Sequence, residues 1–207
     1  MKIKAVILLL FLGLTKLGSA QRLDPYIIGK TNQPYLHIGY SIQDLKAGEA
    51  RALKSDWGVH LTAGKTYFLT PTPIADLFEV GIDWSYVELN YNEYIEPIGD
   101  VDEWKINKFE AGMQVGPAVI FHLTNRIRLH GYFRYSPSYS GIYDDIREEY
   151  HGAFASYFAA GAKLHFFGKL GVGAEKRWGS SKFDITDTDL KETIKQQGPR
   201  IFISFGF

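Results

Sequence analysis

Apolar and polar residues alternate with a period of two along most of this chain. In the clearest run one face is apolar and the other is polar or small, the two sets being Phe78, Val80, Ile82, Trp84 and Tyr86 against Glu79, Gly81, Asp83 and Ser85. Successive side chains of a β-strand point to opposite faces, so this pattern predicts a strand. Similar alternation recurs near residues 36–40, 57–63, 109–116, 127–135, 154–166, 170–177 and 201–207. We therefore predict eight β-strands.

The connections between these segments alternate in length. Short connections cover residues 70–73, 124–125 and 168–169, and long polar ones cover residues 43–56, 91–104, 137–151 and 180–198. Barrels of bacterial outer membranes have short periplasmic turns and longer external loops. Most runs also have the ~9–11 residues that a tilted strand needs to cross a membrane. The prediction is an all-β fold, an eight-stranded antiparallel up-and-down transmembrane β-barrel over residues 35–207, with both chain ends on the periplasmic side.

The direction of the two faces separates a membrane barrel from a soluble one. A soluble, lipocalin-like barrel would place the apolar rows inside. Here the rows opposite the apolar ones carry many charges and glycines, and the last segment, RIFISFGF, is apolar and aromatic to its final residue. We therefore expect the apolar rows to face lipid and the polar rows to face the lumen.

Residues 1–20 have the layout of a secretory signal peptide. A basic start is followed by an apolar and glycine run over residues 5–14 and by small residues up to Ala20. Lys16 interrupts the run, which is shorter than the ~20 apolar residues of a spanning helix. We predict cleavage after Ala20, which leaves a short periplasmic segment over residues 21–34 before the barrel.

The amino-acid composition excludes several kinds of site and partner. The chain has no Cys, so disulfides, thiolate metal sites and a lipid-modified cysteine are excluded. Without residues 1–20 it has 20 basic and 23 acidic residues, a net charge of −3, which argues against a nucleic-acid partner. The 14 Phe, 13 Tyr, four Trp and 21 Gly suit a barrel in lipid.

Aromatic residues are predicted to form a belt at each membrane interface, where a ring can have one apolar and one wet end. On an up-and-down path the outer rim would carry Tyr40, Trp57, Tyr86, Tyr135, Phe154 and Trp178. The periplasmic rim would carry Tyr67, Phe78, Phe121, Phe166 and Phe207.

The predicted lumen face has four charges of each sign, which suggests an internal ion-pair network of Glu79, Asp83, Glu110 and Glu175 with Arg128, Arg134, Lys163 and Arg177. Charges without bulk water must be paired or they cost several kcal/mol each. An eight-stranded barrel is just wide enough for side chains to fill, which favours a structural polar plug. A narrow or gated channel is the alternative.

Catalytic and metal sites find little support. The six histidines are scattered without metal-ligand spacing, so no metal site and no cofactor are expected. His151 has no neighbouring serine in a nucleophile arrangement, and Asp184, Asp187 and Asp189 lack the pattern of a calcium loop. Lys176, Arg177 and Lys182 flank the predicted outer rim and could meet lipopolysaccharide phosphates.

A signal peptide, eight alternating strands and a terminal aromatic strand resemble the small eight-stranded outer-membrane barrels, the OmpA-like and OmpX-like transmembrane domains. In that class the last strand with its final Phe resembles the signal read by the barrel-assembly machinery. The resemblance implies that Ile203, Phe205 and Phe207 carry this signal here. No peptidoglycan-binding domain is expected after Phe207.

The leading functional hypothesis is a non-enzymatic, porin-like outer-membrane protein of a Gram-negative envelope. It would stabilise the envelope or bind a partner protein through its external loops, in contact with outer-membrane lipid and lipopolysaccharide. The alternatives are a narrow channel for small solutes, an accessory subunit of a transport or secretion complex, and a lipid-A-modifying enzyme.

Overall fold

The computed structural model describes residues 32–207 apart from residues 49–51, 71, 76, 99–101, 147, 168 and 185–190. The predicted signal peptide and most of the segment after it therefore lie outside the described residues. Among the described residues no helix is long and apolar enough to cross a membrane. The strands are β1 (Asn32–Ser41), β2 (Asp44–Ala47), β3 (Leu53–Phe68), β4 (Phe78–Ile98), β5 (Asp102–His122), β6 (Ile127–Asp144), β7 (Glu149–Phe166), β8 (Leu170–Asp184) and β9 (Lys191–Gly206).

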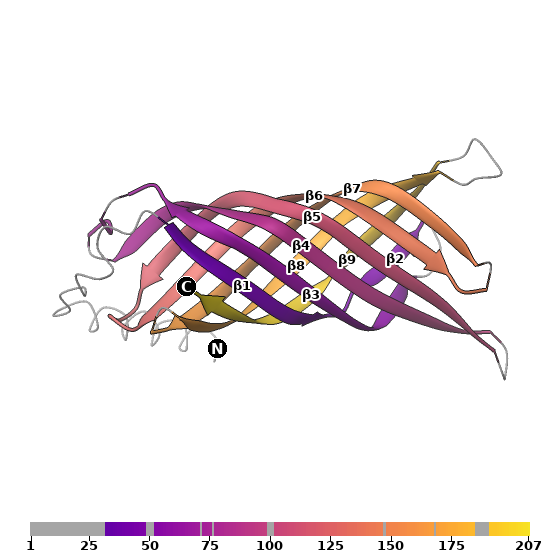
Figure 1. The fold of residues 1–207 in the computed structure, drawn as a ribbon, viewed down its shortest axis with the longest axis horizontal. Coiled ribbons are helices and arrows are strands. Elements are labelled where there is room, and N and C mark those ends of the chain that lie inside the picture. The colour runs from indigo at the N-terminus through magenta and orange to yellow at the C-terminus, as the bar shows by residue number, and fades with distance from the viewer. Residues whose placement is uncertain are drawn as a thin grey trace, which may run out of the picture.

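These strands close into one antiparallel barrel (Figure 1). Each strand from β3 to β9 pairs with the next, and β1 and β2 both lie between β9 and β3. The short strands β1 and β2 together occupy one strand position of the barrel, and the strand is interrupted at Ile42 and Gln43. Hydrogen bonds bridge the break, because Ile42 N donates to Pro199 O at 3.1 Å and Ser55 N donates to Gln43 O at 2.8 Å. With β1 and β2 counted as one interrupted strand, the barrel has the eight strands that the sequence predicts.

The strands are staggered as barrel closure requires. A path of directly paired residues starts at His37 and passes through Thr62, Glu88, Gly112, Ser138, Ala155, Ser181 and Ile194 to Ala47. The path returns to the first strand position, formed by β1 and β2, at residue 47 instead of residue 37, ten residues further on. A stagger of this kind tilts the strands by about 35–45° from the barrel axis.

The barrel is polar inside and apolar outside. On β4 the side chains of Glu79, Asp83 and Ser85 are 0–3% exposed, whereas the outward Ile82 and Trp84 are 40% and 43% exposed. The same alternation runs along the other strands. An outward apolar surface of this extent is stable in lipid but not in water. The predicted orientation of the two faces is confirmed, and the lipocalin-like alternative is excluded.

The predicted long loops are wrong in extent, because most of their residues belong to strands. β4 and β5 have 21 residues each and are joined by residues 99–101, and residues 145–148 join β6 to β7. A tilted strand of this length rises about 50 Å, more than a ~30 Å hydrocarbon core. The sheet is thus longer than the hydrocarbon core and continues beyond it. Polar composition alone did not distinguish this sheet from loop.

Among the described residues, two apolar clusters lie inside the barrel. One is in the half away from Phe207, which is external in the predicted orientation, and contains Leu45, Tyr94, Ile106, Ile142, Ala153 and Phe183. The other contains Ala118, Ile120, Tyr132 and Phe202. Where the outside of the barrel is wet, an apolar interior stabilises the sheet as it does in a soluble protein.

A β-bulge in β4 changes which side chains face the lumen. The pairing of β4 with β5 shifts register between Ser85 and Glu88. As a result both Tyr86 and Val87 face outward, at 42% and 41% exposure, and Glu88 is 1% exposed inside the barrel. A bulge re-aims the side chains that follow it, and here it delivers a carboxylate to the lumen.

Gly116 lies where β5 passes close to β6. A Cβ atom at Gly116 would lie 1.9 Å from the carbonyl oxygen of Phe133, so the two strands would have to move apart. We expect Gly116→Ala to lower the free energy of unfolding by about 1–3 kcal/mol, measured by denaturant unfolding in phospholipid vesicles. The matched control is Gly131→Ala, since the nearest atom to that Cβ is 4.0 Å away. Equal losses in the two variants would contradict the steric explanation.

Candidate functional site

A continuous column of buried ion pairs lies in the middle of the lumen. It runs through residues of alternating charge from five strands, in the order Lys108, Glu110, Arg177, Glu88, Arg200, Glu175 and Arg134. Each member is at most 6% exposed. Ions removed from water are tolerated only when they are paired and hydrogen-bonded. The column meets the pairing condition by sharing each carboxylate between two cations, whereas Nη2 of Arg177 and Nη2 of Arg200 have no hydrogen-bond partner among the described residues.

The geometry of the column is that of charge-assisted hydrogen bonds. Arg177 donates to Glu110 Oε2 at 2.5 Å, and its Nε lies 3.3 Å from Glu88 Oε1. Arg200 Nη1 lies between two carboxylates, 2.7 Å from Glu88 and 3.0 Å from Glu175. Arg134 Nη2 donates to the second oxygen of Glu175 at 3.0 Å. Such bonds are roughly twice as strong as neutral ones and fix the geometry of both partners.

Aromatic rings pack against the cations of the column. The Arg177 guanidinium lies 3.5 Å from the centre of the Tyr157 ring, and the Arg134 guanidinium lies 3.7 Å from the Tyr132 ring. Tyr157 and Tyr132 are inside the barrel, and the Tyr132 hydroxyl donates to Glu175 at 2.8 Å. Cation–π contact gains strength when both groups are desolvated. Charges and rings are therefore packed together inside the barrel at this height.

The eight predicted lumen charges fall into two groups. Glu110, Arg134, Glu175 and Arg177 belong to the column. The other four do not join this chain of contacts, and they are Glu79, Asp83, Arg128 and Lys163.

The second group makes its own contacts with histidines and Tyr35. Glu79 lies 3.0 Å from His122, and Asp83 lies 3.4 Å from His130 and accepts a hydrogen bond from Tyr35. Lys163 Nζ is 3.3 Å from His37 and 4.0 Å from the centre of the Tyr35 ring. Arg128 is half-buried on the lumen side of β6, where it is paired in register with His165 of β7.

Three members of the column were not identified from the sequence. Glu88 follows the bulge, so the alternation of residues 78–86 places it on the wrong face. Lys108 has the same phase as Glu110 but lies before the apolar run that defined the strand. Arg200 opens the terminal segment RIFISFGF, where its phase relative to Ile201 and Ile203 was a usable signal.

Five of the six histidines lie inside the barrel although they are far apart in sequence. His37, His60, His122, His130 and His165 are each at most 5% exposed. His165 Nε2 contacts Ser204 Oγ at 2.8 Å, and His37 is stacked between Tyr35 and Phe202 at 4.4 Å from each ring. Among the described residues no group of three His, Cys, Asp or Glu side chains could hold a metal ion.

All eleven predicted belt residues lie on outward positions of the barrel, but their division into two belts is not correct throughout. Tyr67 and Tyr86 were assigned to opposite rims, yet their hydroxyl groups are hydrogen-bonded to each other. The reason is that β4 extends to Ile98, so Tyr86 is not near its external end.

Further aromatic residues lie on the outer surface of the external part of the barrel. Trp57 packs on Tyr91 at 5.1 Å between ring centres, and Phe109 is stacked on Tyr150 at 5.6 Å. Tyr150 begins the external end of β7 and donates a hydrogen bond to the Tyr139 hydroxyl. This bond, which is lost on ionisation, raises the pKa of Tyr150 to about 12.

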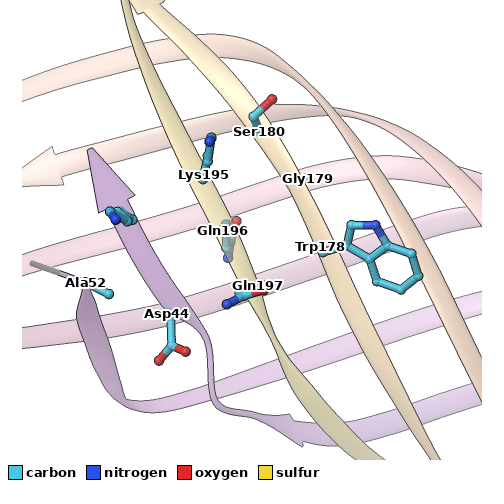
Figure 2. Close-up of a pocket in the computed structure, with 9 residues that line it drawn as sticks. Asp44, Ala52, Trp178, Gly179, Ser180, Lys195, Gln196 and Gln197 are labelled. Atoms are coloured by element: carbon cyan, nitrogen blue, oxygen red, sulfur yellow. The ribbon is translucent and has the colours of Figure 1, made fainter. Parts of the chain in front are cut away.

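A hollow of about 340 Å³ lies on the external half of the barrel, on β2, β8 and β9 (Figure 2). It is lined by Asp44, Lys46, Ala52, Trp178, Gly179, Ser180, Lys195, Gln196 and Gln197. One predicted lipopolysaccharide contact nearby is wrong, because Arg177 is buried in the lumen with 0% exposure. Lys176 and Lys182, on either side of Arg177, face outward and are exposed.

Comparisons with known proteins identify the fold. No family model matches the sequence, and no curated protein matches it closely enough to be a relative. Among solved structures, the chain is similar to Neisserial surface protein A, with a TM-score of 0.50, 11% identity and coverage of 84% of this chain and 97% of that one. It is also similar to Ail, the attachment invasion locus protein of Yersinia pestis, with a TM-score of 0.48, 14% identity and coverage of 86% and 100%.

A third similar structure is the outer membrane protein OprG from Pseudomonas aeruginosa, with a TM-score of 0.38, 11% identity and coverage of 87% and 99%. At these identities the likeness concerns the fold alone. The chain has the fold of the small outer-membrane β-barrels, as the resemblance of its sequence pattern predicted.

Proposed function

We propose that this chain is a non-enzymatic integral outer-membrane protein, a closed barrel that stabilises the envelope or binds a partner protein through its external end. Export would use the signal peptide cleaved after Ala20. Insertion would use the barrel-assembly machinery, which would read Ile203, Phe205 and Phe207. Ile203 and Phe205 of β9 and Phe207, the residue after the strand, are all exposed, so they are available to a docking partner.

The buried ion-pair column across the lumen is the observation that carries this proposal. Arg134, Arg177, Arg200, Lys108 and Tyr157 are each completely buried in the barrel interior. Their contacts converge from strands on opposite sides of the barrel, and a conducting path would have to break several of them. Removing one partner of a buried ion pair costs about 3–5 kcal/mol. A static plug therefore fits the geometry better than an open pore.

The external extension of the sheet supports the binding part of the proposal. β4 and β5 together carry the barrel well beyond the membrane, and the apolar cluster around Tyr94 and Phe183 makes this part rigid. Loops held on a rigid scaffold are common recognition surfaces. The ends of β4, β5, β8 and β9 farthest from the C-terminus, together with Asp145 and Ile146 after β6, would be the first described regions to meet a partner.

Conductance in planar phospholipid bilayers tests the closed lumen. We expect the refolded protein to insert without stepwise currents in about 1 M KCl. A wide porin that is reconstituted in the same way should produce stepwise currents. Insertion is checked separately by the gel shift of the folded barrel between unboiled and boiled samples. Reproducible current steps from inserted protein would overturn the plug and make the chain a narrow channel.

Two further measurements address the remaining alternatives. A mild-detergent pull-down from the native membrane, read by mass spectrometry, identifies a stoichiometric protein partner if the chain is a subunit of a larger complex. A mass shift of lipid A on overexpression would identify a lipid-modifying enzyme. We expect no such shift, and its appearance would contradict the non-enzymatic role.

A further inference from the structure

We propose that the hollow on β2, β8 and β9 is a binding site for a phosphorylated glycolipid of the outer leaflet, with Lys46 and Lys195 holding a phosphate of lipid A. This inference rests on the proposed outer-membrane location and adds a defined site to it.

Two lysines face each other directly on the outer surface. Lys46 of β2 and Lys195 of β9 are paired residues in the antiparallel ladder, and both are exposed. Side chains at paired positions start ~4.5–5.5 Å apart, and like charges there are destabilising. Their neighbours Leu45 and Ile194 pack into the internal apolar cluster, which keeps the two lysines pointing outward. The fold therefore holds two positive charges together where an anion could bridge them.

Neither Lys46 nor Lys195 has an ion-pair partner in the part of the chain that the structure describes. Among the described residues that line the hollow, the carboxylate is that of Asp44, which is paired in register with Lys54 of β3. Figure 2 shows Asp44 at the far end of the hollow from Lys195 and Ser180. The end that contains the two lysines is therefore basic.

A hydroxyl group extends the row of donors. Ser180 of β8 is the paired residue of Lys195, so Lys46, Lys195 and Ser180 lie side by side across three neighbouring strands. Two ammonium groups and a hydroxyl can satisfy several oxygens of one phosphate. Lys182, two residues beyond Ser180 on the same outward face, could meet a second phosphate or a core sugar.

An aromatic surface begins directly below this row. Trp178 is the next outward residue of β8 toward the periplasmic end, about 7 Å along the strand from Ser180. Its ring lies 6.3 Å from that of Phe158 and 6.1 Å from that of Phe133. A tryptophan of this kind is favoured at the membrane interface. The lysines thus lie at the height of lipid headgroups, and the rings lie where acyl chains pack.

This combination selects a lipid over a soluble anion. A free phosphate would use only the lysines and the hydroxyl, and an acidic peptide would gain nothing from rings that lie in the hydrocarbon. A phosphorylated glycolipid uses both parts at once. Because the outer leaflet presents such lipids at high local concentration, even a modest affinity would keep the site occupied.

Binding is tested with the full refolded barrel in detergent, by native mass spectrometry with diphosphorylated lipid A as the probe. We expect the wild-type protein to retain one lipid A, and Lys46→Gln/Lys195→Gln to bind it at least roughly tenfold more weakly, as loss of charge-assisted bonds implies. The matched control is Lys65→Gln/Lys169→Gln, two outward lysines toward the periplasmic end of the barrel, and it should bind as the wild type does.

Two more probes separate the sources of the phosphate. Dephosphorylated lipid A should bind the wild-type protein as weakly as diphosphorylated lipid A binds the Lys46/Lys195 double variant. Inorganic phosphate should not compete at concentrations well above that of lipid A. Equal binding of lipid A by the wild type and the Lys46/Lys195 variant would overturn the site, and effective competition by inorganic phosphate would overturn the choice of a lipid.

The denaturation midpoint of the Lys195→Gln variant relative to the wild type should depend on whether lipid A is present. In phospholipid vesicles without lipid A, Lys195→Gln removes a like-charge repulsion, so its denaturation midpoint should equal or exceed that of the wild type. With lipid A present, the wild-type midpoint should rise and the variant midpoint should not. A variant that is less stable in both kinds of vesicle would indicate a structural role for Lys195 and contradict the proposal. These assays do not depend on conductance, so the closed lumen and the lipid site can fail independently.

Discussion

Glu88→Gln is expected to lower the free energy of unfolding by about 3–5 kcal/mol, because it leaves two buried guanidinium groups short of a negative charge. Glu88 Oε1 contacts Arg177 Nε at 3.3 Å and Arg200 Nη1 at 2.7 Å, and Ser136 donates to its second oxygen. Glutamine keeps the shape and removes the charge. The measurement is urea unfolding in phospholipid vesicles, followed by tryptophan fluorescence, with a fall in the midpoint at constant slope.

The matched control is Glu93→Gln on the same strand. Glu93 faces outward and accepts a hydrogen bond from Trp57 Nε1 at 2.9 Å, which a glutamine oxygen can also accept. Its change should stay within about 0.5 kcal/mol. The double variant Glu88→Gln/Arg200→Gln should recover part of the loss, since it removes the uncompensated charge as well. A Glu88→Gln barrel as stable as the wild type would mean that the column is not held by its ion pairs.

Ile203→Arg is expected to cost about 2–4 kcal/mol, because it places a charge on the part of the barrel that faces the middle of the bilayer. Ile203 of β9 is 49% exposed and pairs with Ile38 and Val172, so its surroundings on the outer surface are aliphatic. The same vesicle unfolding assay measures the loss. The fraction of protein that inserts should fall as well, since Ile203 belongs to the predicted assembly signal.

Ile146→Arg is the control for this change. Ile146 is 57% exposed in the turn between β6 and β7, at the external end of the barrel. The substitution is chemically identical but the new side chain meets water, so the change in stability should be close to zero. If both arginines cost the same, the outward face of β9 does not lie in hydrocarbon, and the membrane-spanning assignment of this surface would be wrong.

These two predictions express one physical principle from opposite sides of the sheet. A barrel in lipid saturates its backbone hydrogen bonds through closure, and it then places polar side chains inside and apolar ones outside. An inward charge such as Glu88 is stabilised only by its partners in the lumen. An outward charge at the position of Ile203 would have none. The lipid site proposed at Lys46 and Lys195 fits between these limits, at the height where the outer surface becomes polar.

The sequence by itself determined the topology and the orientation of the faces. A period of two is a local property of each strand, so the runs around Ile82 and Phe133 could be assigned to the lipid side without any knowledge of their neighbours. Closure of the eight strands into a barrel could also be predicted, because an open sheet edge is not tolerated in lipid. The same local phase identified Glu110, Arg134, Glu175 and Arg177 as lumen residues.

Only the tertiary structure decided which charges meet and how far the sheet extends. The bulge after Ser85 shifts the phase that brings Glu88 inside, and a bulge depends on pairing between two strands. The stagger of the strands sets which residues share a height, which is why Tyr67 contacts Tyr86 and why Lys46 lies beside Lys195. Polar segments such as residues 91–98 continue as strand because a partner strand is already in register beside them. Pairing and register are properties of two segments at once, so a single run of residues does not contain them.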